Sequence, residues 1–363
     1  MSGTSLKLPW WVDYALLPLL NLSLALLVAG LVILSTGEDP IEAVTAMVQG
    51  ALGSGEGIGY TLYYATDMIF TGLAVAVAFH CGLFNIGAEG QAYLGGLGLT
   101  LVCLYLDWLP FWLVFPLAML AAAAFGAAYA ALPAWLQAKR GSHIVITTIM
   151  LNFIAYALME WLLVNVLIKP GQMSPETRAF APNAQLPSMQ RLLGGLGIEI
   201  AQTPLNIAFL VALVCMVLVW VLIWHTRWGY GVRVVGASPR AAVYAGIAPG
   251  RRIIQAMVLS GALSAGVALN EVMGAQHKLL VNFPGGYGFT GIAVALMGRN
   301  HPAGVLISAV LFGALYQGGA ELSFDMPTIS SYLIVALQGL VILFTGGLAL
   351  MLRPALVRLF GRA

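Results

Sequence analysis

Charged residues are scarce in this chain. Of its 363 residues only 8% are Asp, Glu, Lys or Arg, whereas 60% are hydrophobic. Soluble domains carry about 25% charged residues, so the composition excludes an ordinary water-soluble fold. The formal net charge of +2 gives no indication of binding to nucleic acid. The sequence predicts an all-α integral membrane protein surrounded by membrane lipid.

Signals for a metal site or for nucleotide binding are also missing. The chain has three cysteines, which lie in or beside apolar runs without metal-ligand spacing. None of the lysines follows a glycine in the way that the phosphate-binding motif G-x-x-x-x-G-K-S/T requires. We therefore expect a non-catalytic chain that binds no cofactor itself, so that any ATP and Mg would be held by a separate protein.

Long apolar runs recur along the chain, and most approach or exceed the roughly 20 residues that a membrane-spanning helix needs. Together with a small-residue run at 285–297 they predict about ten transmembrane helices in a single domain, 1–363. The expected spans are 14–36, 58–79, 83–106, 111–136, 144–168, 205–224, 253–273, 285–297, 303–320 and 329–352. A proline-rich stretch at about 169–204 predicts a long extracytoplasmic loop.

The basic residues predict the orientation. If the amino terminus is cytoplasmic and the spans alternate, twelve of the sixteen Lys and Arg residues face the cytoplasm, including Lys7 and Arg362. Cytoplasmic loops carry an excess of such residues. Both termini are therefore expected in the cytoplasm, with the arginine-rich loop at about 226–252 on the same side.

That arginine-rich loop contains the signals of one short helix. Ser238 suits the position that caps the first free amides, Pro239 suits the first helical residue, and Gly246 suits a left-handed residue that ends a helix. About two turns measure about 10 Å, which is too short to cross a membrane. A short capped helix between spans is suited to contact with another protein, although arginines in such a loop are also ordinary topology signals.

The second informative stretch is Gly82–Gln91, where three glycines interrupt helical regularity and polar side chains stand next to apolar ones. An unpaired charge in hydrocarbon costs about 2.5 to 3.5 kcal/mol, so Glu89 should face protein, water or the interface. Irregular backbone at membrane depth is tolerated where it lines a cavity, which makes this stretch a candidate pathway. A Gly-rich cytoplasmic turn with an interfacial Glu89 is the alternative.

A similar pattern occurs later in the chain. Gly285–Phe289 could begin another broken helix, and Glu271 lies near Lys278, with which it could pair. Aromatic residues here, such as Tyr287 and Phe289, could contact a solute, or they could simply pack. The candidate pathway residues are Phe84, Asn85, Glu89, Gln91, Asn152, Asn270, Glu271, Tyr287 and Phe289.

Taken together, three motifs resemble the permease subunits of ABC importers in the branched-chain amino acid, ribose and nucleoside group, most of all the nucleoside type that works with a basic membrane lipoprotein. These motifs are Gly82–Gln91, Val235–Ile247 and Gly288–Gly298, and the resemblance covers about residues 58 to 350.

The resemblance implies a type II importer fold and a place in the bacterial inner membrane. It also implies a paralogous permease partner, a cytoplasmic ABC ATPase that binds ATP and Mg, and an extracytoplasmic substrate-binding protein or lipoprotein. The expected cargo is a nucleoside, or otherwise a simple sugar. A proton-coupled secondary transporter, using acids such as Glu89 and Glu271, is the alternative.

By the same resemblance, the short helix would be the coupling helix that docks in a cleft of the ATPase. Its residues are Ser238, Pro239, Arg240, Ala241, Ala242, Val243, Tyr244, Ala245, Gly246 and Ile247.

Overall fold

The computed structural model describes residues 9, 11–12, 16–169, 171–195, 197, 201–329 and 331–360. Within these residues the regular secondary structure is helical, with two isolated β-bridges and no β-strand. Lys7 and Arg362, which were counted in predicting the orientation, lie outside the described residues.

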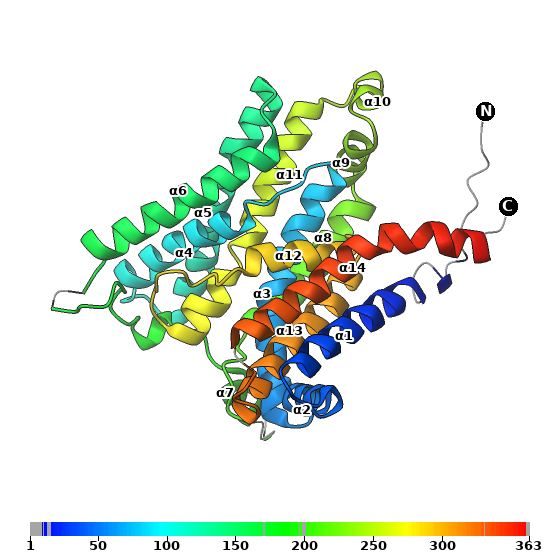
Figure 1. Cartoon of the computed structure of the whole chain (residues 1–363). Helices are drawn as coiled ribbons and strands as arrows, with labels where there is room; N and C mark the ends of the chain where they lie inside the picture. The colour runs from blue at the N-terminus through cyan, green and yellow to red at the C-terminus, as the bar shows by residue number, and fades with distance from the viewer. Residues whose placement is uncertain are drawn as a thin grey trace. The chain divides into compact units, whose positions relative to one another are not determined.

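The helices follow one another along the chain as Figure 1 shows. They are α1 (Leu17–Ser35), α2 (Pro40–Leu52), α3 (Gly55–His80), α4 (Ala88–Tyr105), α5 (Phe111–Arg140), α6 (Ile144–Asn165), η2 (Pro182–Ala184), α7 (Met189–Gly194), α8 (Ala208–His225), α9 (Arg227–Ala237), α10 (Pro239–Tyr244), α11 (Pro249–Ser264), η3 (Leu269–Gln276), α12 (Tyr287–Met297), α13 (Pro302–Asp325) and α14 (Ser331–Phe360).

Two compact units divide the chain. The first combines Met1–Gly57 with Ala314–Ala363, and the second is Ile58–Gly313. The second unit lies inside one continuous stretch of sequence, and it contains every candidate site residue predicted above. The expectation of a single transmembrane domain stays a prediction.

In the second unit, α3 and the segment formed by α11 and η3 are central. In the most apolar 18-residue stretch of α3 about 83% is buried, and in that of Pro249–Gln276 67% is buried. The corresponding fractions in α5, α6 and α8 are only 22 to 28%. Helices α4, α5, α6 and α11 pack side by side (Figure 1). The outer helices expose large apolar side chains such as Leu120, Phe153 and Leu218. Such a surface is stable in lipid rather than in water.

Within the part of the chain that the structure describes, six helices are long and apolar enough to cross a membrane, or seven if the bent pair of Ser23–Ser35 and Pro40–Leu52 counts as one span. The predicted number of ten is not confirmed, and even if the 30-residue helix α14 crosses, it would need shorter or more polar helices to cross as well. One of these is α12, whose eleven residues would extend only about 16 Å. Another is α4, which carries Glu89 and Gln91 near its amino end.

The first unit begins with a sharp bend. Helix α2 turns by 116° from the end of α1. The bend follows from the sequence: Asp39 caps α2 by accepting a hydrogen bond from the Ile41 amide at 2.8 Å, and Pro40 occupies the first turn. Helix α2 then packs closely on α13, since a Cβ at Gly318 would lie 2.4 Å from the Met47 carbonyl oxygen.

The stretch predicted as a long extracytoplasmic loop contains only short helices in its described residues, and it is packed against its neighbours. It contains η2 and α7, and the bridges Glu176 to Leu280 and Ser188 to Asn206 join it to the segments that follow η3 and precede α8. Its Arg178 forms an ion pair with Asp107 at 2.7 Å. The loop therefore covers one end of the second unit as a fixed layer.

Candidate functional site

The short helix predicted from Ser238 to Ile247 forms as α10. The Ser238 hydroxyl accepts a hydrogen bond from the Ala241 amide at 3.3 Å, and Pro239 is the first helical residue. At the other end, Gly246 has φ +73° and the Ile247 amide donates to the Ala242 carbonyl at 2.9 Å. The start and stop signals in the sequence are confirmed.

One face of α10 is anchored and the other is exposed. Ala242 is fully buried in a cluster with residues of α9, α11 and the segment after α3, and Ile247 packs against the same cluster. Val243 is 62% exposed and Tyr244 is 95% exposed. Arg240 is exposed as well. Helix α10 therefore presents an arginine, a valine and a tyrosine outward from a rigid base.

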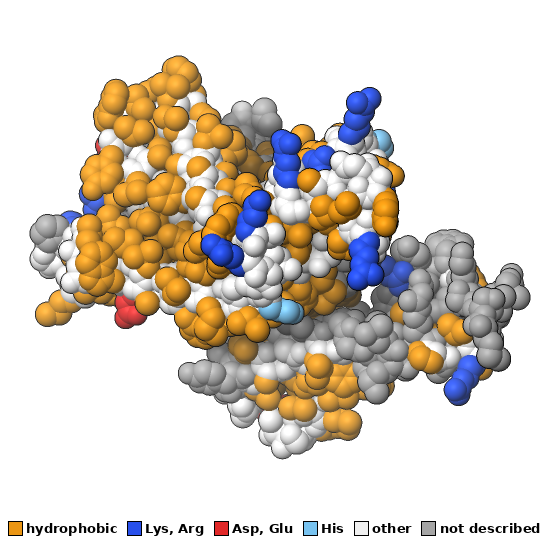
Figure 2. All heavy atoms as spheres, turned by 90° about the horizontal axis from the view of Figure 1, so that it is seen from above, with side chains coloured by type: hydrophobic (Ala, Val, Ile, Leu, Met, Phe, Trp, Pro, Cys, Tyr) orange, Lys and Arg blue, Asp and Glu red, His pale blue; other side chains and the backbone are white. Residues whose placement is uncertain are grey.

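The base of α10 is joined closely to α3. A Cβ at Gly236, near the end of α9, would lie 2.3 Å from the carbonyl oxygen of His80, the last residue of α3. Only a glycine permits this approach. Figure 2, a view onto the face that carries α10, shows several Lys and Arg side chains there among the hydrophobic ones. A displacement of α10 would reach the central helix through these contacts.

The predicted irregular stretch after α3 leads to a carboxylate that caps a distant helix. Glu89 is fully buried. Its Oε1 accepts from the Gly286 amide at 2.8 Å and its Oε2 from the Gly288 amide at 2.7 Å. The Tyr156 hydroxyl donates to Oε1 at 3.1 Å. Because free amides at a helix amino end favour a negative charge, this site stabilises a carboxylate.

This geometry decides between the two interpretations of Glu89. A residue that is fully buried and held by three donors is not an interfacial side chain of a surface turn. Glu89 faces protein, which is one of the three environments expected from the sequence. It joins the amino ends of α4 and α12, both of which follow irregular backbone.

Three further candidates brace the same irregular stretch. The Asn85 amide donates to Gln91 Oε1 at 2.9 Å and to the Ser260 hydroxyl at 2.8 Å. Asn152 accepts from the Gly90 amide at 3.0 Å and donates to the Ile86 carbonyl at 3.0 Å. Buried backbone without helical partners needs such bonds. These side chains therefore hold the broken helix in place.

The aromatic candidates separate into packed and exposed residues. Phe84 contacts Phe79 with ring centroids 5.2 Å apart, and Tyr287 is buried. Phe289 is 44% exposed. Of these three rings, Phe289 is the one best placed to meet a solute or a partner.

Asn270 and Glu271 lie on η3, a π-helix in the centre of the second unit. The predicted pairing of Glu271 with Lys278 is wrong, because Lys278 instead binds Glu176 of the long loop at 2.7 Å. The chain reverses at His277, which adopts φ +53° at the end of η3 and so separates the two side chains. Glu271 accepts from the Tyr63 hydroxyl at 2.6 Å.

Sequence reasoning missed Asp67 in this region. Asp67 is fully buried on α3 and accepts from the Asn270 amide at 2.8 Å. The signal was available: a lone acid inside the apolar run 58–79 is costly in a membrane and marks a buried polar contact.

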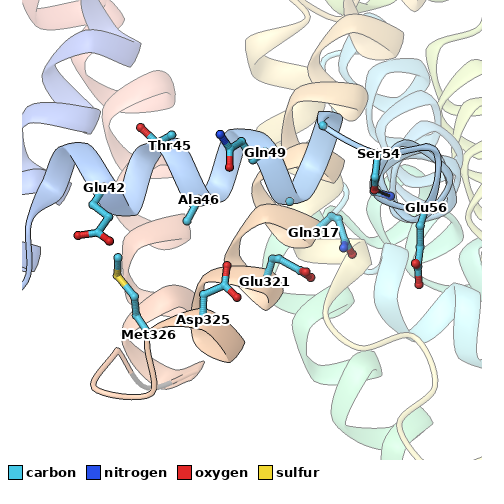
Figure 3. Close-up of a pocket in the computed structure, with 13 residues that line it drawn as sticks. Glu42, Thr45, Ala46, Gln49, Ser54, Glu56, Gln317, Glu321, Asp325 and Met326 are labelled. Carbon is cyan, nitrogen blue, oxygen red and sulfur yellow. Dashed lines mark hydrogen bonds between the residues drawn. The ribbon is translucent and has the colours of Figure 1, made fainter.

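A polar pocket of about 1110 Å³ lies in the first unit, between α2 and the end of α13 (Figure 3). No Lys or Arg is among the residues that line it, which are Glu42, Thr45, Ala46, Gln49, Gly50, Gly53, Ser54, Glu56, Gly57, Gln317, Glu321, Asp325 and Met326. The pocket is therefore strongly acidic.

Comparison with known proteins identifies the family. Residues 57–346 match the family described as the branched-chain amino acid transport system / permease component. The chain belongs to this family. It is a non-catalytic, multi-pass permease component of the plasma membrane. The resemblance seen in the motifs is confirmed, and the alternative of a proton-coupled secondary transporter is not retained.

Individual relatives cover most of the permease chain. It is 35% identical to the glucose ABC transporter permease protein TsgB13 of Haloferax volcanii, over 93% of this chain and 88% of the relative. It is 31% identical to the guanosine ABC transporter permease protein NupP of Bacillus subtilis, over 92% and 93%. It is 32% identical to the nucleoside ABC transporter permease protein NupB of Lactococcus lactis, over 85% of each chain.

Each of these organisms also has a second, less similar permease. The identities are 23% for TsgC13, 26% for NupQ and 29% for NupC.

Proposed function

We propose that this permease component imports a nucleoside in an ABC importer whose ATPase docks on α10. The observation that carries the docking proposal is the two-sided character of α10, with Ala242 fully buried and Tyr244 95% exposed. A helix that has to transmit a force needs a rigid base and a free contact face. Arg240, Val243 and Tyr244 would enter the cleft of the ATPase, while Ala242 and Ile247 would fix α10 to the permease.

The proposed topology places α10 and both termini in the cytoplasm, with about ten spans. Support comes from the excess of Lys and Arg in loops assigned to the cytoplasm. Exposed Lys139 and Arg140 at the end of α5 belong to this set, together with Arg227, Arg240 and Arg251 around α10. The packed loop after α6 would then face outward, toward the substrate-binding protein.

The proposed mechanism is a lever movement. ATP and Mg bound by the ATPase subunits would close them, and α10 would move with the cleft that holds it. Through Ala242 and the close contact of Gly236 with His80, the movement would reach α3 and α11. A ligand shifts an equilibrium between two states only by the difference in its affinity for them. ATP can therefore drive this switch only if the ATPase contacts α10 differently in the two states of the transporter.

A heterodimer of two permeases is the proposed assembly. Three organisms each have two permeases related to this chain, and in each pair one is more similar to it than the other. This pattern favours a paralogous partner over a second copy. An ABC ATPase and an extracytoplasmic binding protein or lipoprotein complete the proposed importer.

A nucleoside is the proposed cargo, with a simple sugar as the other outcome of the test. Support comes from two relatives named for guanosine and nucleosides and from one named for glucose. Nucleosides and sugars share hydroxyl groups on a sugar ring. The buried candidates Asn85, Gln91 and Asn152 are engaged in bonds that brace the broken helix. Selectivity would therefore reside mostly in the separate binding protein.

The test is uptake and ATP hydrolysis by the reconstituted transporter, with Tyr244→Asp as the variant. We expect assembly of the permease to persist, whereas substrate-stimulated hydrolysis and uptake fall at least tenfold. Tyr105, at the far end of α4, is 68% exposed and Tyr105→Asp is the matched control. Full coupling in Tyr244→Asp would contradict the role of α10. Competition of uptake by guanosine but not by glucose would support the nucleoside.

A further inference from the structure

Two buried acids meet in the centre of the permease. Asp67 lies on α3 and is fully buried, and Glu271 lies on the π-helix η3 and is 6% exposed. They are linked through their neighbours: Asn270 donates to Asp67 Oδ2 at 2.8 Å, and Tyr63, one turn before Asp67, donates to Glu271 Oε1 at 2.6 Å. Each carboxyl group also lies within reach of the other's charge.

No cation balances this pair within the described residues. Arg178 pairs with Asp107 and Lys278 pairs with Glu176, both near the long loop, so neither of these cations pairs with Asp67 or Glu271. Two carboxylates in contact without a cation repel each other strongly where water is excluded. Such pairs persist in proteins by sharing a proton.

The hydrogen bonds leave one oxygen of this pair without a partner. Asp67 Oδ1 is buried and has no donor among the described residues. A buried acceptor without a partner costs about 1 to 3 kcal/mol. If Oδ1 carries a proton, it becomes a donor to Glu271 and the unsatisfied atom disappears. Glu271 already accepts from Tyr63 and keeps a small exposed fraction, so it is the better place for the negative charge.

We propose that Asp67 and Glu271 form a proton-binding site in the permease core, in which Asp67 Oδ1 carries one proton and donates it in a hydrogen bond to Glu271. The bond joins α3 to η3. A π-helix is rare and is often found at functional sites, and here it places Asn270 and Glu271 together against α3. The proton is part of the packed structure, and its presence does not depend on which solute the importer carries.

The chain of donors beyond the pair has a consistent direction. Asn206 donates to Asn270 Oδ1 at 3.0 Å, and Asn270 Nδ2 donates both to Asp67 and to the Tyr63 carbonyl at 3.1 Å. Asn206 also donates to the Pro204 carbonyl at 3.0 Å, whereas Asn270 gives both of its side-chain bonds to α3. Asp67 completes the chain only if it too has a proton to give.

Infrared spectroscopy of the purified full-length transporter tests the proposal. The carbonyl stretch of a protonated carboxylic acid is separate from that of a carboxylate and shifts in D₂O. We expect this band in the unmodified protein at neutral pH and its loss in Asp67→Asn, whose amide can replace the protonated acid at Oδ1 and Oδ2. Glu271→Gln should also abolish this band. A neutral amide at position 271 removes the second negative charge, so Asp67 can lose its proton.

Glu89→Gln is the matched control, since Glu89 is equally buried but is held by three donors. The band should survive this change. Absence of the band in the unmodified protein would overturn the proposal, as would its survival in either Asp67→Asn or Glu271→Gln. Its loss in Glu89→Gln would move the proton to Glu89 and would also overturn it. Size-exclusion profiles verify that each variant is folded.

A second measurement distinguishes a protonated Asp67 from an Asp67 that is merely buried. Asp67→Asn should melt within a few degrees of the unmodified protein, whereas Asp67→Ala, which leaves Glu271 and Asn270 without their partner, should melt clearly lower. Equal and large losses in both variants would contradict a protonated Asp67.

Discussion

Glu89 caps the helix that begins beside Gly288, although 199 residues separate them in the chain. The contact joins two stretches of irregular backbone, one before α4 and one before α12. A Cβ at Gly288 would lie 2.3 Å from the Glu89 amide nitrogen, so the approach also requires a glycine. The two motifs that carried much of the sequence resemblance are thus one structural unit.

Glu89→Gln should destabilise the permease by about 2 kcal/mol, because a charged acceptor of buried amides is replaced by a neutral one whose NH₂ group faces a donor. The melting temperature of the purified protein measures this. Glu160→Gln, at an exposed acid of α6, is the control and should change little. Equal melting of both variants would contradict the capping role.

Gly261→Ala should disturb the packing of α11 on α5. The added Cβ would lie 2.3 Å from the Gly126 carbonyl oxygen, and overpacking of this kind costs about 1 to 3 kcal/mol. Gly250, at the start of the same helix, has its nearest neighbour at 3.6 Å and gives a matched control in Gly250→Ala. The melting temperature should fall only for Gly261→Ala.

Neighbouring positions on α10 should respond in opposite ways. Ala242→Glu places a charge in a fully buried site and should reduce the yield of folded protein, at a cost of at least about 2 kcal/mol. Val243 is 62% exposed, so Val243→Glu should leave stability within about 0.5 kcal/mol and reduce coupled ATP hydrolysis instead. If Val243→Glu melts as low as Ala242→Glu, the two-sided description of α10 is wrong.

The long loop should loosen in acid. Lys278 holds the pKa of Glu176 below its usual value, and Gln172 also donates to this carboxylate. A lowered pKa in the folded state means that the pair stabilises the loop above the unfolded pKa of about 4.3 and that this contribution is lost as the pH falls through the folded value.

Limited proteolysis of the loop between pH 3 and pH 7, chosen as roughly the range in which carboxylates titrate, measures this effect. Glu176→Gln should remove the part of the pH dependence that the pair contributes. Because the pair is close to the surface, the expected change is small. An unchanged pH profile in Glu176→Gln would contradict the assignment.

Local rules predicted the helix ends well and the long-range partners poorly. Ser238, Pro239 and Gly246 act within a few residues of themselves, so their capping roles could be read directly from the sequence. The breaks before α4 and α12 were predictable for the same reason, because clustered glycines interrupt a helix locally.

The amides that Glu89 caps lie about 200 residues away from it, as do the partners of Asp67 and Glu271, and no local pattern specifies them. Lys278 was paired with the wrong acid because sequence proximity was taken for spatial proximity, and the left-handed turn at His277 was not foreseen. The polar residues of the broken helix stay candidates for the pathway, and the hydrogen bonds that hold its backbone could not be predicted from the sequence.

A photo-crosslinking residue at position 244 tests the central claim most directly. If α10 is the docking helix, irradiation of membranes should join the permease to an ABC ATPase subunit, and the same residue at the exposed position 105 should give no such product. Crosslinks from position 244 only to lipid, in a transporter that still imports its solute and hydrolyses ATP, would contradict the account.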